Sequence, residues 1–190
     1  MSTGEFLVRA VACIKVAGSE VAGQPIRVDD EQSPVIDLLD NGLMVVYLVD
    51  EGDRFVYVQH KHANAIKADP RGLLDFGLAN LSRLAEAKLK LFRHGAIHGL
   101  QLDGQFEASL ILLDKLWDEA LAQFTPHGAI VAIPARDVLA FCDADDTAGI
   151  AELRALAQRV TAVSDHLLTP QLFRRIDGAW QPFEPHGGNP

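Results

Sequence analysis

Apolar, β-branched runs separated by turn residues recur along the chain and predict antiparallel hairpins. Two pairs of such runs are Leu43–Val49 with Phe55–Gln59, around residues 50–53, and Leu172–Ile176 with Ala179–Phe183, around Asp177-Gly178. β-branched and aromatic residues favour strands, and Asp and Gly are the residues of short hairpin turns. Strands joined by such short turns pair antiparallel. The first run is apolar at successive positions, which indicates a central strand buried on both faces.

A third hairpin is predicted inside the stretch His127–Asp146. Its arms are Ala129–Ile133 and Val138–Cys142, and Pro134–Asp137 lies between them. Proline has a fixed φ and no amide hydrogen, so it suits a bend and disrupts a central strand. We therefore expect a turn at Pro134–Asp137 and both arms in the middle of a sheet.

Apolar residues spaced by three, four or seven positions predict three amphipathic helices. The first runs from Asp69-Pro70 to about Phe92 with Leu74, Leu78, Leu81, Leu84 and Leu91 on one face, the second and most strongly patterned is Phe106–Phe124, and the third carries Ile150, Leu153, Leu156, Val160 and Val163. Asp69 suits a helix cap and Pro70 the first helical position. Asp146 or Thr147 suits the cap of the third helix.

These elements predict an α+β fold: a mainly antiparallel sheet built from hairpins, with about three main helices packed on it. We expect a single domain over residues 1–184 and a flexible tail at 185–190. The region 1–33 is poorly assigned. Within it, Phe6–Val16 fits neither the helical nor the strand period, and a short strand is conceivable at Ile26–Val28.

Composition narrows the classes of partner. The chain of 190 residues has 48% hydrophobic and 23% charged residues, as a globular protein does, and a net charge of −9. Nucleic-acid binding depends on Lys and Arg neutralising phosphates, so we expect no nucleic-acid partner. No apolar stretch is long enough to span a bilayer, and we expect no membrane partner. A homo-oligomer remains open.

Cys13 and Cys142 are the only cysteines. Two isolated thiols are typical of buried, small apolar residues in a reducing compartment, although the sequence leaves a disulfide between them open. The start of the chain lacks the pattern of an export signal, because Arg9 and Lys15 interrupt the apolar run. We therefore expect a cytoplasmic protein.

Four phrases together resemble a known family. They are Leu43–Val49 with its following hairpin, GQFEASLILLDKLW at Gly104–Trp117, VAIPARDVLAFCD at Val131–Asp143 and LFRRIDGAW at Leu172–Trp180. In order and content they resemble the YtpQ-like family of uncharacterised bacterial proteins, over residues 34–183. The resemblance implies a compact bacterial cytosolic domain and carries over no reaction, cofactor or catalytic residue.

The polar residues at the ends of the third hairpin are the main candidates for a site. Arg136 and Asp137 lie in its turn and Asp143 at its exit, and we expect these three to bind a ligand. An arginine fork matches a carboxylate or phosphate, and sites are often placed on turns of a rigid sheet. The plainer interpretation is that Asp137 bonds its own turn and that Asp145 or Asp146 caps the next helix.

Other motifs give weaker signals for chemistry. His60 with His62 and His94 with His98 form pairs at ligand-like spacing, but without a recognised zinc pattern, and we expect no metal. Glu107 suits the entry to a helix, and no serine elbow or phosphate-binding glycine loop is present. We expect no cofactor.

The sequence thus favours a non-catalytic domain that binds a protein or a small molecule, because no catalytic constellation remains once core and turns are assigned. The alternative is a hydrolase-like enzyme that uses the carboxylates of Asp143–Asp146 together with Arg136. A structural subunit of a homo-oligomer is a third class.

Overall fold

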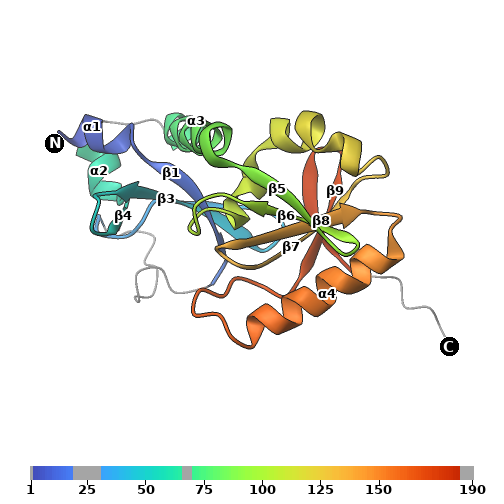
Figure 1. Cartoon of the computed structure of the whole chain (residues 1–190). Coiled ribbons are helices and arrows are strands. Elements are labelled where there is room, and N and C mark those ends of the chain that lie inside the picture. Colours follow the sequence, from blue (N-terminus) through green and yellow to red (C-terminus); the bar gives the residue numbers. More distant parts are fainter. Residues whose placement is uncertain (1, 19–30, 66–69, 185–190) are drawn as a thin grey trace. The chain divides into compact units, whose positions relative to one another are not determined.

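The computed structural model describes residues 2–18, 31–65 and 70–184, and the chain in it forms two compact units, Met1–Ala87 and Lys88–Pro190 (Figure 1). Both units combine helices with antiparallel sheets, so the predicted α+β class is confirmed. That the chain behaves as a single domain stays a prediction. The suggested strand at Ile26–Val28, the cap at Asp69 and the tail at 185–190 lie outside the described residues.

The first unit is built on a four-stranded antiparallel sheet. Its strands are β1 (Val11–Val16), β2 (Ile36–Leu38), β3 (Leu43–Asp50) and β4 (Phe55–Tyr57). β3 is central, since β1 pairs along one edge of it and both β2 and β4 pair along the other. Its side chains are almost all buried, as expected for a strand that is apolar on both faces.

Three helices belong to the first unit: α1 (Thr3–Leu7), α2 (His60–Ala65) and α3 (Pro70–Lys88). The ambiguous run Phe6–Val16 contains the end of a helix and then a strand. α3 packs closely on the sheet at Gly77, where an added Cβ would lie only 3.0–3.1 Å from atoms of Ala12 and Tyr47. No helix in the described ranges combines the length and apolar content that crossing a bilayer requires.

The prediction that the first long helix reaches Phe92 is wrong. α3 ends at Lys88, and Leu91 and Phe92 lie instead in a strand, paired with Leu100 and Gly99. Leu91 follows Leu84 by seven residues, as on one face of a helix, but such spacing is only a local preference for helix. The backbone hydrogen bonds of the following hairpin satisfy the same residues in an extended conformation.

The second unit is built on a six-stranded antiparallel sheet. Its strands are β5 (Lys90–His94), β6 (Ile97–Gln101), β7 (Ala129–Ala135), β8 (Val138–Asp143), β9 (Leu172–Ile176) and β10 (Ala179–Phe183), in the spatial order β10-β9-β7-β8-β6-β5. The predicted hairpin of β7 and β8 is confirmed and lies at the centre. Pro134 is not in its turn, however, but inside β7, where the pairing with β8 shifts register between Ala132 and Ala135. The shift accommodates a residue without an amide hydrogen.

One face of this sheet is covered by α4 (Thr147–Thr161) (Figure 1). Asp146 caps it as predicted, since its carboxylate accepts the amide of Gly149 at 2.9 Å. Leu153 is fully buried against the sheet. The predicted apolar stripe extends one residue too far, because Val163 lies beyond the end of the helix and is 82% exposed.

The opposite face is covered by residues 108–124, and the prediction of a continuous helix there is wrong. The segment consists of short turns: the 3-10 turns η1 (Ala108–Leu112) and η3 (Ala122–Phe124) flank a π-type turn, η2 (Leu116–Ala120). Two indoles explain the break. Trp117 Nε1 donates to the carbonyl oxygen of Leu110 at 2.9 Å, and Trp180 Nε1 to that of Ile111 at 2.8 Å. An α-helix would give these carbonyls to amides four residues on.

A buried arginine fastens this segment to the sheet. The guanidinium of Arg175, on β9, donates to Asp118 at 2.9 Å and to Asp114 at 3.0 Å, and it lies 5.4 Å from the ring centroid of Trp180. Its side chain is only 8% exposed. Charge-assisted bonds of this kind, with the arginine desolvated, hold an irregular segment that lacks its own helical ladder.

The close fit of α4 on the sheet can be tested with two equivalent glycines. Gly149 and Gly72 are each the third residue of a helix, but a Cβ at Gly149 would lie 2.7 Å from Cys142 Cβ, whereas one at Gly72 would meet nothing within 4 Å. We expect Gly149→Ala to lower the free energy of unfolding by about 1–3 kcal/mol through overpacking. Gly72→Ala should raise it by up to about 1 kcal/mol through helix propensity. Urea unfolding followed by circular dichroism measures both, and an unchanged Gly149→Ala protein would contradict the packing described.

Candidate functional site

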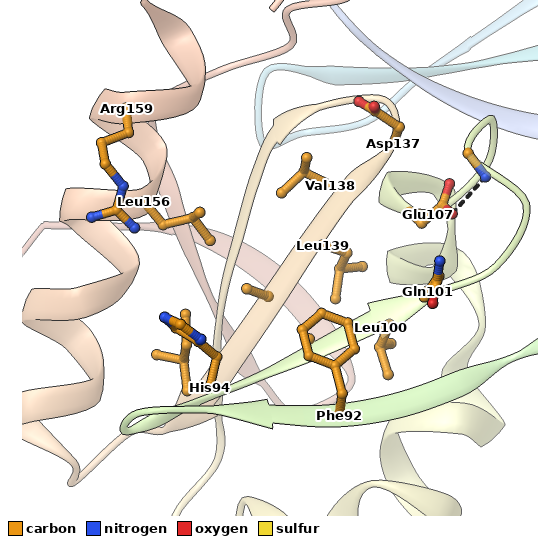
Figure 2. A pocket seen from close by; sticks show the side chains of 14 residues that line it. Phe92, His94, Leu100, Gln101, Glu107, Asp137, Val138, Leu139, Leu156 and Arg159 are labelled. Atoms are coloured by element: carbon orange, nitrogen blue, oxygen red, sulfur yellow. Dashed lines mark hydrogen bonds between the residues drawn. The ribbon is translucent and has the colours of Figure 1, made fainter. Parts of the chain in front are cut away.

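A cavity of the second unit lies on the α4 face of the sheet, where β5, β6 and β8 meet the C-terminal half of the helix (Figure 2). Its volume is about 660 Å³. The walls are mainly apolar: they are formed by Phe92, Ile97, Leu100, Val138, Leu139 and Leu156. A cavity of this size and lining is in the range of small-molecule pockets.

Two small residues lie beneath one wall of the cavity. Phe92 pairs with Gly99 across β5 and β6, and Gly99 pairs with Ala140 across β6 and β8. The Phe92 ring lies directly over Gly99, so close that an added Cβ would be 2.2 Å from Phe92 Cζ. The missing side chain of Gly99 thus lets the ring lie on the sheet, where it forms one wall of the cavity beside Ala140.

Polar groups lie at two ends of this apolar cavity (Figure 2). At one end are Arg159, from α4, and His94, from β5. His94 Nε2 is 3.9 Å from a carboxylate oxygen of Glu152, while Arg159 is exposed and has no ion pair among the described residues. At the other end are the acidic side chains of Asp137 and Glu107. The cavity is therefore polarised, with positive charge available at one end and negative charge at the other.

Glu107 is the unusual member of the lining, because its carboxylate is buried and only half satisfied. The residue is 2% exposed. Its Oε1 accepts the backbone amides of Leu102 at 2.9 Å and Gly104 at 2.7 Å, whereas Oε2 is buried without a hydrogen-bond partner in the described chain. Glu107 does stand at the entry to η1, but its side chain forms no cap bond there. The carboxylate holds the preceding loop instead.

The three residues predicted to bind a ligand do not come together. Arg136 and Asp137 form the turn of the β7–β8 hairpin, and Asp143 lies at the opposite end of β8. Asp143 lies six residues after Asp137 along an extended strand, which is about 20 Å. Asp137 is exposed and lines the cavity. The structure therefore does not bring together the groups that the hydrolase alternative requires, namely Arg136 and the carboxylates after β8.

Arg136 holds its turn mainly through its backbone. Its amide donates to the carbonyl oxygen of His166 at 3.1 Å, and its own carbonyl accepts the amide of Ala108 at 3.0 Å. The side chain is half-buried, and its Nε is buried without a hydrogen-bond partner in the described ranges. The turn thus joins η1 to the segment that follows α4.

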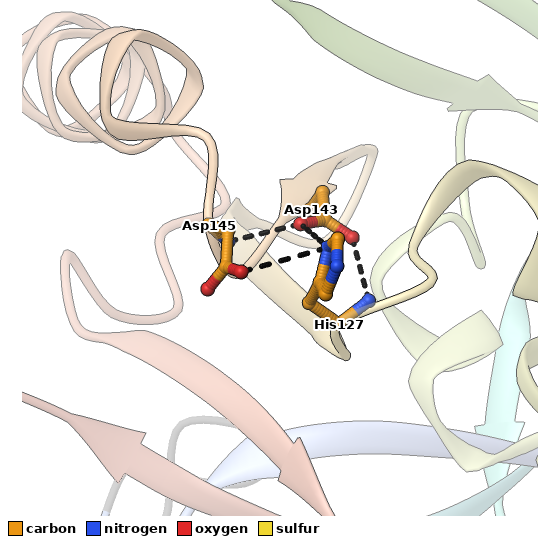
Figure 3. A group of neighbouring side chains, drawn as sticks. All are labelled: His127, Asp143 and Asp145. Carbon is orange, nitrogen blue, oxygen red and sulfur yellow. Dashed lines mark hydrogen bonds and ion pairs between the residues drawn. The ribbon is translucent and has the colours of Figure 1, made fainter.

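At the other end of the hairpin, His127, Asp143 and Asp145 form a cluster whose ligating atoms lie within 4.8 Å of one another (Figure 3). The imidazole Nδ1 is 3.0 Å from Asp143 Oδ1 and 3.6 Å from Asp145 Oδ2. His127 was missed as a candidate, although the hairpin register indicates its place. Because Ala129 pairs with Asp143, continuing the pairing by two residues puts His127 opposite Asp145.

The bonds of this cluster explain it as the end of a hairpin. Asp143 accepts the amide of His127 at Oδ2 and that of Asp145 at Oδ1, both at 2.9 Å. Burial by itself would raise the pKa of Asp143, but these two amides and the imidazole outweigh it and lower the pKa. One imidazole and two carboxylates could ligate a divalent cation, yet the Asp143 oxygens already have protein donors, and nothing further at the cluster points to an ion.

The other candidates do not form sites. Cys13 and Cys142 are buried free thiols, as expected. Burial, followed by Asp146 and Asp143, raises the pKa of Cys142 to about 12, so the thiol is not a nucleophile near neutral pH. His94 and His98 lie on opposite faces of the β5–β6 hairpin. His94 lines the cavity, whereas His98 stacks on Phe141 on the other face.

No protein-family model matches the chain, and neither a curated protein nor a solved structure is detectably similar to it. The resemblance to the YtpQ-like family therefore stays a prediction. The argument for function rests on the geometry of the second unit.

The Asp143 cluster predicts a pH-dependent stability. A carboxyl group whose pKa is lowered by folding stabilises the protein above its unfolded pKa of about 3.9, and this contribution is lost as the pH falls through the folded pKa. We expect Asp143→Asn to lose about 1–2 kcal/mol at neutral pH and to differ less from the parent near pH 3. The matched control is Asp145→Asn, because the Asp145 side chain is 69% exposed. Urea unfolding at a series of pH values measures this, and equal losses at both pH values would contradict it.

Proposed function

We propose that the second unit binds a small organic molecule, with its apolar body against the Phe92 ring and the apolar side chains around Ala140. The observation that carries this is the cavity itself: about 660 Å³ with apolar walls and polar groups confined to its two ends. Small-molecule sites combine these features, since apolar walls supply affinity and a few polar groups fix orientation.

Binding is favoured over covalent catalysis by a hydroxyl, thiol or amine. The 14 residues that line the cavity include no Ser, Thr, Cys or Lys, and its titratable groups are carboxylates, an imidazole and a guanidinium. The lining does include Asp137, so the predicted role of that residue in binding a ligand is part of this proposal. Arg136 and Asp143 are not part of it.

Two equally exposed phenylalanines allow a matched test. Phe92, in the cavity wall, is 51% exposed, and Phe76, on α3 of the first unit, is 49% exposed. We expect the neutral dye N-phenyl-1-naphthylamine to bind the parent protein saturably with a rise in fluorescence. Phe92→Ala should weaken its binding about tenfold, because an aromatic contact is removed from the bound dye, and Phe76→Ala should leave it unchanged.

Circular dichroism and thermal unfolding check that both variants remain folded. The proposal is wrong if the parent protein shows no saturable binding of the dye, or if Phe76→Ala weakens dye binding as much as Phe92→Ala does.

A further inference from the structure

The buried carboxylate of Glu107 indicates which ligands the cavity selects. The two backbone amides that bind Oε1 hold the carboxylate in place. Oε2 remains buried without a partner within residues 2–18, 31–65 and 70–184. A buried oxygen without a donor costs free energy, and this cost is recovered when a donor reaches it.

We propose that the ligand carries a protonated amine that donates to Glu107 Oε2. This inference rests on the proposed function, because it requires that the cavity bind a small molecule. Of the other polar side chains that line that end, Asp137 adds a second negative charge and Gln101 is neutral. Arg159 lies at the opposite end of the cavity, where a cationic group would meet a like charge (Figure 2).

Anionic groups are disfavoured at the same position. A ligand carboxylate near Glu107 would place two like charges side by side in a mainly apolar cavity. A neutral hydroxyl could donate to Oε2 but would lack the charge that makes such a bond short and strong. Among ligands that share one apolar body, we therefore expect the amine to bind most tightly, the alcohol less tightly and the carboxylate most weakly.

Three probes with the same aromatic body test this order: 2-(1-naphthyl)ethylamine, 2-(1-naphthyl)ethanol and 1-naphthylacetate. Each is titrated against the protein near neutral pH by displacement of N-phenyl-1-naphthylamine and by calorimetry. We expect the amine to bind about tenfold or more tightly than the alcohol, and the carboxylate to bind most weakly.

Glu107→Gln is the decisive variant. Its amide oxygen can still accept from the amides of Leu102 and Gly104, while an NH₂ group replaces Oε2. We expect the amine to lose its advantage over the alcohol, with the affinity for the alcohol changed less than threefold. Asp145→Asn is the matched control, because it removes an exposed acid of the same unit that does not line the cavity, and we expect it to change amine binding less than threefold. Asp137→Asn removes the other acid at the same end and should weaken amine binding less than Glu107→Gln does.

The outcomes separate this inference from the proposed function. If no probe binds, the cavity is not a small-molecule site and the proposed function fails. If all three bind the parent protein equally, the cavity binds apolar molecules but the amine inference is overturned, whether or not Glu107→Gln folds. An amine preference that persists in a folded Glu107→Gln protein also overturns it, and a loss in Asp137→Asn alone would move the contact to Asp137.

Discussion

The second unit depends on a row of small residues across the middle of its sheet. Gly99, Ala140 and Ala132 are successive neighbours on β6, β8 and β7, all on the face that α4 covers. Small side chains bring a helix close to a sheet, and α4 uses this at Gly149, which lies against Cys142. Where the row extends past the helix toward β5, the Phe92 ring lies over Gly99 and forms a wall of the cavity.

The two ends of the central hairpin carry out different tasks. At the exit of β8, Asp143 receives two backbone amides and an imidazole, so its charge stabilises the local fold. At the turn, backbone bonds from Arg136 anchor the hairpin to the segments on either side of it, which leaves the Asp137 side chain exposed at the cavity. Sequence adjacency to the same hairpin therefore does not imply a common site, because a strand of six residues separates its ends.

Features set by neighbouring residues were predictable from the sequence, and features set by distant ones were not. The turn at Asp177-Gly178 follows from residue chemistry, since both residues adopt the positive φ that such turns need. The same is true of the Asp146 cap. The helix expected over residues 106–124 fails because Trp180, far along the chain, takes a carbonyl that the helix would need.

The position of β5 has a consequence for how the cavity is reached. β5 is one of the two edge strands of this sheet, its only strand neighbour in the described sheet is β6, and all five of its residues are exposed. Edge strands fray more readily than central ones, so the wall that carries Phe92 has a lower local stability than the central hairpin. Amide protons along β5 should therefore exchange with solvent faster than those of β7, and an occupied cavity should slow that exchange. Local opening of this one hairpin would widen the cavity while the central strands stay paired.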